Sequence, residues 1–178
     1  MGSCASCSPN RSIAPGRYCR GIRITVSKNA SVRDRKFVYL ASASPRRAEL
    51  LSQLGVTFAV TPAAIDETPQ NGEAPDAYVE RVAREKVHAA RAALQDRDAP
   101  VLAADTAVVV ADRILGKPID EADAARMLSS LSGRSHEVLT AVAALDGDRE
   151  DVVLSRTTVV FRPLDPDEFA AYWKTGEP

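Results

Sequence analysis

The pattern of apolar and polar residues divides this chain into two parts. Residues 1–36 show no sustained apolar period and are rich in Ser, Arg, Pro and Gly. From Phe37 onward, short apolar runs alternate with stretches of helical spacing. We therefore expect one folded domain over 37–178, preceded by a disordered basic leader over 1–36.

Four stretches combine helical spacing with start or stop signals. The first is capped by Ser44 and stopped by Gly55, and the second runs from about Asp76 to Leu94. The third is capped by Asp120 and ends at Gly133, and the fourth opens at Asp165. Each stretch has an expected apolar face. In chain order, these faces are Leu50, Leu51 and Leu54; Tyr78, Val82, Ala89 and Ala93; Ala124, Leu128 and Leu131; and Phe169, Tyr172 and Trp173.

Short apolar runs predict the strands. We expect strands at 37–41, at 56–60 and at 101–104, the last ending at Asp105. A hairpin follows over 107–115 with its turn at Ala111-Asp112, and two longer strands cover 138–145 and 152–161. Because strands first alternate with helices and later form hairpins, the pattern predicts an α/β domain with a mixed sheet.

Charge and cysteine content support this division. The 178 residues carry a net charge of −1, which points to neither nucleic acid nor a membrane as partner. Residues 1–36 hold eight Lys or Arg against one acid, Asp34, so the rest of the chain is acidic. All three cysteines lie in the leader. The domain is therefore not held by disulfides and suits a reducing compartment, which we expect to be the cytoplasm.

The leader allows four interpretations. Met1-Gly2-Ser3-Cys4-Ala5-Ser6 fits an N-myristoylation pattern, with Cys4 as a second acyl site. The Arg- and Ser-rich composition is also typical of an organelle transit peptide. Cys4-x-x-Cys7 could begin a metal site, although no second pair follows at zinc spacing. The remaining interpretation, which we favour, is a leader without function or a start codon assigned too far upstream.

The sequence Ser42-Ala43-Ser44-Pro45-Arg46-Arg47 lies where a strand turns into a helix. Helix N-termini present free N–H groups and a partial positive charge, and two arginines are electrostatically unfavourable there unless an anion is bound. The forked guanidinium groups suit phosphate oxygens. The alternative is two solvated arginines beside an ordinary cap.

Other chemical groups are dispersed along the chain. Asp105-Thr106 follows an apolar strand, and Asp66-Glu67 lies in a polar loop. Such carboxylates could hold a divalent metal or simply belong to turns. The basic candidates that remain are Lys86, Lys117, Arg134 and His136. Together these groups match a site for a metal-bound polyphosphate, and the absence of a Gly-x-x-x-x-Gly-Lys-Ser/Thr motif excludes a P-loop enzyme.

Six blocks of the sequence stand out together: residues 40–51, Asp66-Glu67, the stretch Tyr78-Val79-x-Arg81-x-Ala83-x-x-Lys86, Ala103-Ala104-Asp105-Thr106, Gly116-Lys117-Pro118, and residues 131–140. In the order and spacing of these blocks, the chain resembles the Maf family across essentially all of 37–178. The resemblance implies an α/β fold like that of inosine triphosphate pyrophosphatases, with a twisted mixed sheet, flanking helices and two lobes around a cleft.

The resemblance also implies a reaction and residue roles. Maf-type enzymes hydrolyse nucleotides between the α and β phosphates with a divalent metal, Mg²⁺ or Mn²⁺. By resemblance, Asp105 accepts the proton of the attacking water, Glu67 acts with it in catalysis, and both carboxylates are partners of the metal. Residues implied to bind the substrate are Ser42, Ser44, Arg46, Arg47, Lys86, Thr106 and Lys117.

Two short motifs indicate the subgroup. Pro45-Arg46-Arg47 and Asp105-Thr106 resemble the branch that cuts dTTP and UTP to the monophosphate and pyrophosphate, removing non-canonical nucleotides. The branch that acts on 7-methyl-GTP carries Pro-Trp-Arg and Asp-Gln at these places and is the alternative. A further alternative is a catalytically impaired nucleotide-binding regulator of cell division.

The resemblance predicts two more features. Members of the family form homodimers, so we expect one here. They also continue beyond the place that corresponds to Pro178 with segments that close the cleft and help select the base. We therefore expect a C-terminal segment to be missing from 37–178, with weaker activity and base discrimination as the result.

Overall fold

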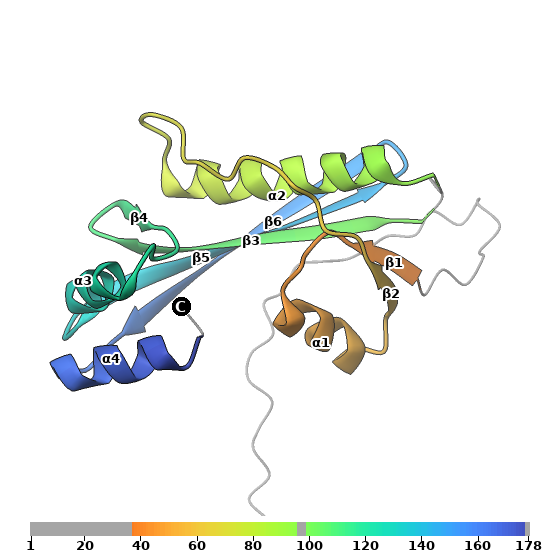
Figure 1. Cartoon of the computed structure of the whole chain (residues 1–178). Helices are drawn as coiled ribbons and strands as arrows, with labels where there is room; N and C mark the ends of the chain where they lie inside the picture. The colour runs from red at the N-terminus through yellow and green to blue at the C-terminus, as the bar shows by residue number, and fades with distance from the viewer. Residues whose placement is uncertain (1–36, 96–98, 177–178) are drawn as a thin grey trace, which may run out of the picture. The chain divides into compact units, whose positions relative to one another are not determined.

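The computed structural model describes residues 37–95 and 99–176 (Figure 1). The expectations about residues 1–36 and about a segment beyond Pro178 lie outside the described residues. The elements in chain order are β1 (Phe37–Leu40), α1 (Pro45–Gln53), β2 (Thr57–Val60), α2 (Pro75–Ala93), β3 (Val101–Val110), β4 (Arg113–Leu115), α3 (Glu121–Leu131), β5 (Ser135–Asp146), β6 (Arg149–Val160) and α4 (Pro166–Lys174).

The strands form one mixed sheet in the order β2-β1-β3-β5-β6, with β4 paired to β3. β1 pairs parallel with β2 and β3, whereas β3, β5 and β6 are antiparallel neighbours. The predicted hairpin is confirmed, because Ala111 and Asp112 turn with φ of 46° and 59° between β3 and β4. The expected mixed α/β fold is therefore correct.

On the edge of β3 that faces away from β5, two other strands pair with β3 and leave a gap between them. β1 pairs there up to Leu102, and β4 pairs there from Val108 onward. Among the described strands, residues 103–107 pair only with β5. The prediction that the strand ends at Asp105 is wrong, because β5 continues to pair with β3 as far as Val109. Asp105 therefore lies in the middle of a strand, beside an open edge.

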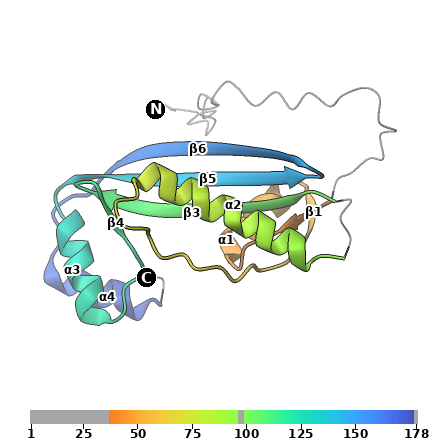
Figure 2. The ribbon, with the colours of Figure 1, turned by 90° about the horizontal axis from the view of Figure 1, so that it is seen from above.

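Helix α2 covers one face of the sheet, as Figures 1 and 2 show. Its fully buried residues include Val79, Val82 and Val87, which share a core with Leu139 and Ala141 of β5. Burial of such side chains is the main stabilising term in a domain of this size.

The predicted apolar stripe of α2 is only half correct. Tyr78 and Val82 are buried, but Ala89 is half-buried and Ala93 is exposed. The buried stripe continues through Lys86 and Ala90, because residues four apart lie on the same side of a helix. A lysine therefore points into the protein from the middle of this helix.

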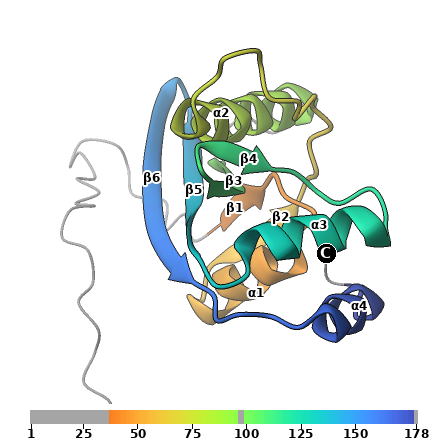
Figure 3. The same ribbon diagram turned by 90° about the vertical axis from the view of Figure 1, so that its left-hand side faces the viewer.

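The other helices lie at the two ends of the sheet. α1 lies beside β1 and β2, whereas α3 and α4 lie together at the opposite end, and α1 and α4 are on the side away from α2 (Figures 1 and 3). The expected apolar face of α1 is not buried within the described domain, since Leu50 and Leu54 are 58% and 76% exposed. No helix in the described ranges is both long and apolar enough to cross a membrane.

Candidate functional site

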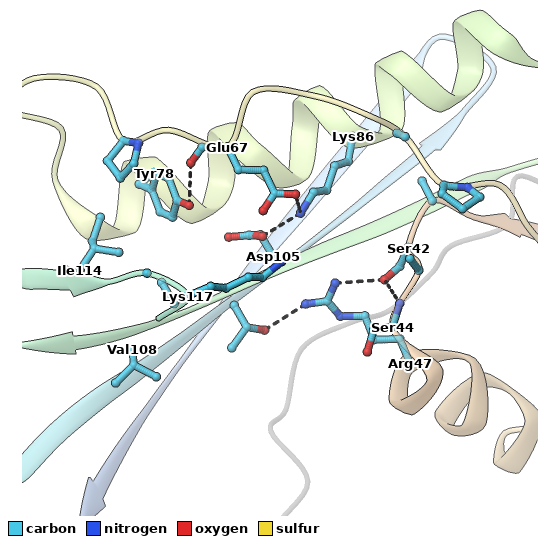
Figure 4. A pocket seen from close by; sticks show the side chains of 18 of the residues that line it. Ser42, Ser44, Arg47, Glu67, Tyr78, Lys86, Asp105, Val108, Ile114 and Lys117 are labelled. Carbon is cyan, nitrogen blue, oxygen red and sulfur yellow. Dashed lines mark hydrogen bonds and ion pairs between the residues drawn. The ribbon is translucent and has the colours of Figure 1, made fainter. Parts of the chain in front are cut away.

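A cavity of about 1000 Å³ opens beside the gap in β3. The residues that line it come from the β1–α1 connection, the start of α1, the loop 61–74, α2, β3, β4 and the two residues after β4, so parts of the chain far apart in sequence meet here (Figure 4). The polar side chains among them are Ser42, Ser44, Arg47, Glu67, Tyr78, Lys86, Asp105, Thr106 and Lys117.

Two carboxylates and one ammonium group meet in this cavity. Lys86 Nζ lies 2.9 Å from Asp105 Oδ1 and 3.0 Å from Glu67 Oε1. The side chains of Lys86 and Asp105 are 10% and 9% exposed, whereas that of Glu67 is 43% exposed. Asp105 points toward α2 because it shares the α2-facing side of the sheet with its β5 partner Ala141. Charged groups as buried as Lys86 and Asp105 require such pairing.

Tyr78 fixes the loop that carries Glu67. Its hydroxyl donates to the carbonyl oxygen of Glu67 at 2.9 Å. Burial, followed by the negative charges of Asp105 and Glu67, raises the pKa of Tyr78, so the phenol stays protonated and remains a donor. The sequence places Tyr78 in an apolar stripe and in one of the six blocks, but gives it no role in the site. Its position eight residues before Lys86 on the same helix face is the signal that could have placed it in the site.

Arg81 holds the same loop from the other side. Its guanidinium donates to both carboxylate oxygens of Glu73, at 2.6 and 2.8 Å, and to the carbonyl oxygen of Thr68 at 3.2 Å. Asp66 does not line the cavity; it accepts from the Thr68 N–H at 2.9 Å, and hydrogen bonds from Thr68 lower its pKa. Of the predicted Asp66-Glu67 pair, only Glu67 belongs to the cavity.

Arg47 joins the start of α1 to the gap in β3. Its guanidinium donates to Ser42 Oγ at 3.2 Å, to the Ala104 carbonyl oxygen at 2.8 Å and to Thr106 Oγ1 at 3.2 Å. Thr106 Oγ1 is also 3.1 Å from Thr140 Oγ1 on β5. Arg47 is therefore committed to protein acceptors and orders the residues on both sides of Asp105.

The start of α1 differs in detail from the prediction. Ser44 is the N-cap residue as expected, but its side chain makes no capping hydrogen bond. Its N–H donates to Ser42 Oγ at 3.2 Å instead. Ser42 is 8% exposed, and its hydroxyl thereby connects the backbone of this turn to Arg47.

Of the catalytic, metal-binding and substrate-binding residues that the resemblance implies, all except Arg46 line the cavity. Arg46 is exposed, since consecutive residues of a helix point about 100° apart and Arg47 takes the inward direction. His136 is also outside. It is 5% exposed, its ring lies edge-on to Phe161 at 4.8 Å between centroids, and burial lowers its pKa. His136 is therefore a buried packing residue.

The family model described as Maf-like protein matches residues 37–178. A protein of Methylobacillus flagellatus named dTTP/UTP pyrophosphatase is 52% identical over 141 residues, which cover 79% of this chain and 71% of that protein. A protein of the same name from Myxococcus xanthus is 51% identical over 145 residues, covering 82% and 72%. This chain belongs to the Maf family. All the cavity residues of this Maf chain lie within the matched region.

Solved structures give a more distant likeness. The Ham1 protein of Staphylococcus aureus aligns with a TM-score of 0.49 and 17% identity over 68% of this Maf chain and 70% of its own. A dITP/XTP pyrophosphatase of Mycobacterium abscessus aligns with a TM-score of 0.45 and 20% identity over 79% and 95%.

Proposed function

We propose that this chain hydrolyses nucleoside triphosphates, with dTTP and UTP as the preferred substrates, to the monophosphate and pyrophosphate. The observation that carries the proposal is the cluster of Asp105, Lys86 and Glu67 inside a cavity large enough for a nucleotide. The choice of dTTP and UTP rests on relatives of that name at about 50% identity.

The cavity is lined by both polar and apolar residues. Ser42, Ser44 and Lys86 contribute hydroxyl and ammonium groups that suit phosphate oxygens. Near β4 the lining includes the apolar residues Val108 and Ile114. A nucleotide would place its phosphates between α1 and Asp105 and its base toward β4, where Lys117 lies at the rim.

Asp105 is the proposed proton acceptor. A water molecule between this carboxylate and the triphosphate bonds to the α-phosphorus, while its proton passes to Asp105. The bond from the α-phosphorus to the oxygen it shares with the β-phosphorus breaks, and pyrophosphate leaves with that oxygen and its electron pair. Lys86 and the exposed Lys117 offset the negative charge that develops on the phosphates.

The two carboxylates also fit a divalent metal. The described residues contain no group of three or more His, Cys, Asp or Glu side chains that could hold one. Glu67 and Asp105 converge on one point, however, and magnesium is often held by one or two carboxylates with water and substrate phosphates completing its coordination. When bound, Mg²⁺ or Mn²⁺ would neutralise charge on the phosphate oxygens.

The test is pyrophosphate release from a nucleotide panel of dTTP, UTP, CTP, GTP, ATP and 7-methyl-GTP, with magnesium or manganese. We expect release from dTTP and UTP at least about tenfold faster than from the others, a difference of about 1.4 kcal/mol in barrier. Faster release from 7-methyl-GTP would instead assign the chain to the alternative branch. Nucleotide binding without any release would leave it a binding protein.

A homodimer and a cytoplasmic location stay predictions. Analytical ultracentrifugation of the full chain checks the first, because a dimer has twice the mass of 19.1 kDa. Cell fractionation checks the second.

A further inference from the structure

The Lys86 ammonium occupies the space between the two carboxylates of the site (Figure 4). It lies 2.9 Å from one and 3.0 Å from the other. An ammonium group has three N–H donors, so it can bond both carboxylates and retain one donor for a third partner. The geometry gives Lys86 the place that a bridging cation would take.

The same place is the one a divalent ion needs. Magnesium binds carboxylate oxygens at about 2.0–2.1 Å. An ion held by both Glu67 and Asp105 would therefore lie in the volume that Nζ now fills. Two positive groups cannot share that volume, because like charges at such short distances repel strongly.

We propose that Lys86 is a stand-in cation that holds Glu67 and Asp105 together until a divalent metal displaces it. The displaced ammonium then pairs with a phosphate oxygen of the nucleotide. The pairing of the ammonium with the nucleotide rests on the proposed function, which this exchange of cations deepens. Removal of the lysine exposes two facing carboxylates, whose repulsion favours any cation that can bridge them.

The exchange of cations has two consequences for binding. Without nucleotide, a metal must break the ion pairs of a largely buried lysine, so its affinity is low. With nucleotide, the phosphates accept the displaced ammonium, so metal and nucleotide strengthen each other's binding by the same factor. A lysine that only contacted phosphate, and never the metal position, would not weaken metal binding to the free protein.

The experiment measures Mn²⁺ binding to the full chain without nucleotide, by the electron paramagnetic resonance signal of free Mn²⁺. We compare the parent chain with Lys86→Met and with Lys117→Met as a matched control. Both variants lose one positive charge from the cavity lining, but only Lys86 contacts the carboxylates in the ion pairs described above. We expect Lys86→Met to bind Mn²⁺ at least about tenfold more tightly than the parent chain, and Lys117→Met to stay within about threefold of it.

Thermal melting gives a second readout. In EDTA, Lys86→Met should have a lower melting temperature than the parent chain. Added Mn²⁺ should raise the melting temperature of this variant by more than it raises that of the parent chain. Should this variant not fold in EDTA, Lys86→Gln, which keeps a hydrogen-bond donor, replaces it in the same measurements. Mn²⁺ binding by the Lys86 variants that is equal to or weaker than binding by the parent chain overturns the inference.

The outcome is separable from the proposed function because no nucleotide is present. If the parent chain releases no pyrophosphate from any nucleotide but Lys86→Met binds Mn²⁺ more tightly, the proposed function fails and the exchange of cations stands. If pyrophosphate is released and the Mn²⁺ affinities are equal, only the exchange is overturned.

Discussion

The guanidinium of Arg47 donates to the carbonyl oxygen of Ala104 at 2.8 Å, directly beside Asp105. This carbonyl lies in the stretch of β3 between the pairing of β1 and that of β4. The carbonyl of Leu102, two residues earlier, accepts from Ala41 N at 2.8 Å on the same edge. Arg47 therefore replaces the neighbouring strand that Ala104 lacks, and it sets the backbone position of Asp105.

Arg47→Lys should destabilise the fold and lower turnover. A lysine is a point donor without the planar fork that reaches Ser42, Ala104 and Thr106 together. Leaving a buried acceptor unsatisfied costs about 1–3 kcal/mol. Urea unfolding measures this loss. The matched control is Arg46→Lys, which changes an exposed arginine and should alter stability by less than about 0.5 kcal/mol. Equal losses of unfolding free energy from the two substitutions would show that Arg47 does not replace the missing strand at Ala104.

Asp105→Asn should lower turnover of dTTP by about 10²–10⁴-fold, the usual loss when a general base is removed. The amide keeps the shape of the carboxylate, so the circular dichroism spectrum should be unchanged. Glu67→Gln should keep more activity, because Glu67 is 43% exposed and is the weaker candidate for proton acceptor. Steady-state kinetics of both variants test the assignment, and an Asp105→Asn rate within twofold of the parent contradicts it.

The pairing of Glu73 with Arg81 should make stability depend on acid pH. Hydrogen bonds from the Arg81 guanidinium lower the pKa of Glu73 from 4.5 to about 2. A carboxyl with a lowered pKa in the folded state stabilises that state fully above its unfolded pKa. The contribution is then lost as pH falls through the folded pKa.

Glu73→Gln measures this contribution. The parent chain should be more stable than the variant above about pH 4.5, and the difference should disappear as the pH approaches about 2. Urea unfolding at several pH values checks it. A difference that stays constant from pH 6 to pH 2 would mean that the charge of Glu73 is not the cause.

The core between α2 and the sheet can be tested with two matched valines. Val79 is 0% exposed, whereas Val160 is 74% exposed. Val79→Ala should lower the free energy of unfolding by at least about 1.5 kcal/mol, because it removes two buried methyl groups and leaves a cavity. Val160→Ala should change stability by less than about 0.5 kcal/mol. Thermal melting of both variants compares them directly.

The sequence by itself determined the order and type of the elements. Apolar spacing predicted the four helices and the mixed sheet, and Pro45, Asp120 and Gly133 mark helix boundaries because their backbone preferences act locally. The Asp120 cap is confirmed, since Asp120 Oδ1 accepts from Asp123 N at 2.7 Å. The six motif blocks likewise predicted the family before any contact was known.

Only the tertiary structure decided which groups meet. Lys86 is 19 residues from both Asp105 and Glu67, and nothing local brings the three together. The gap in β3 depends on where β1 and β4 stop pairing with this strand. The gap leaves the Ala104 carbonyl for Arg47, and not Arg46, to bond. These are contacts between distant segments, set by packing and by the need of buried polar groups for partners. A single sequence records which groups are present, but their distances arise only when the chain folds.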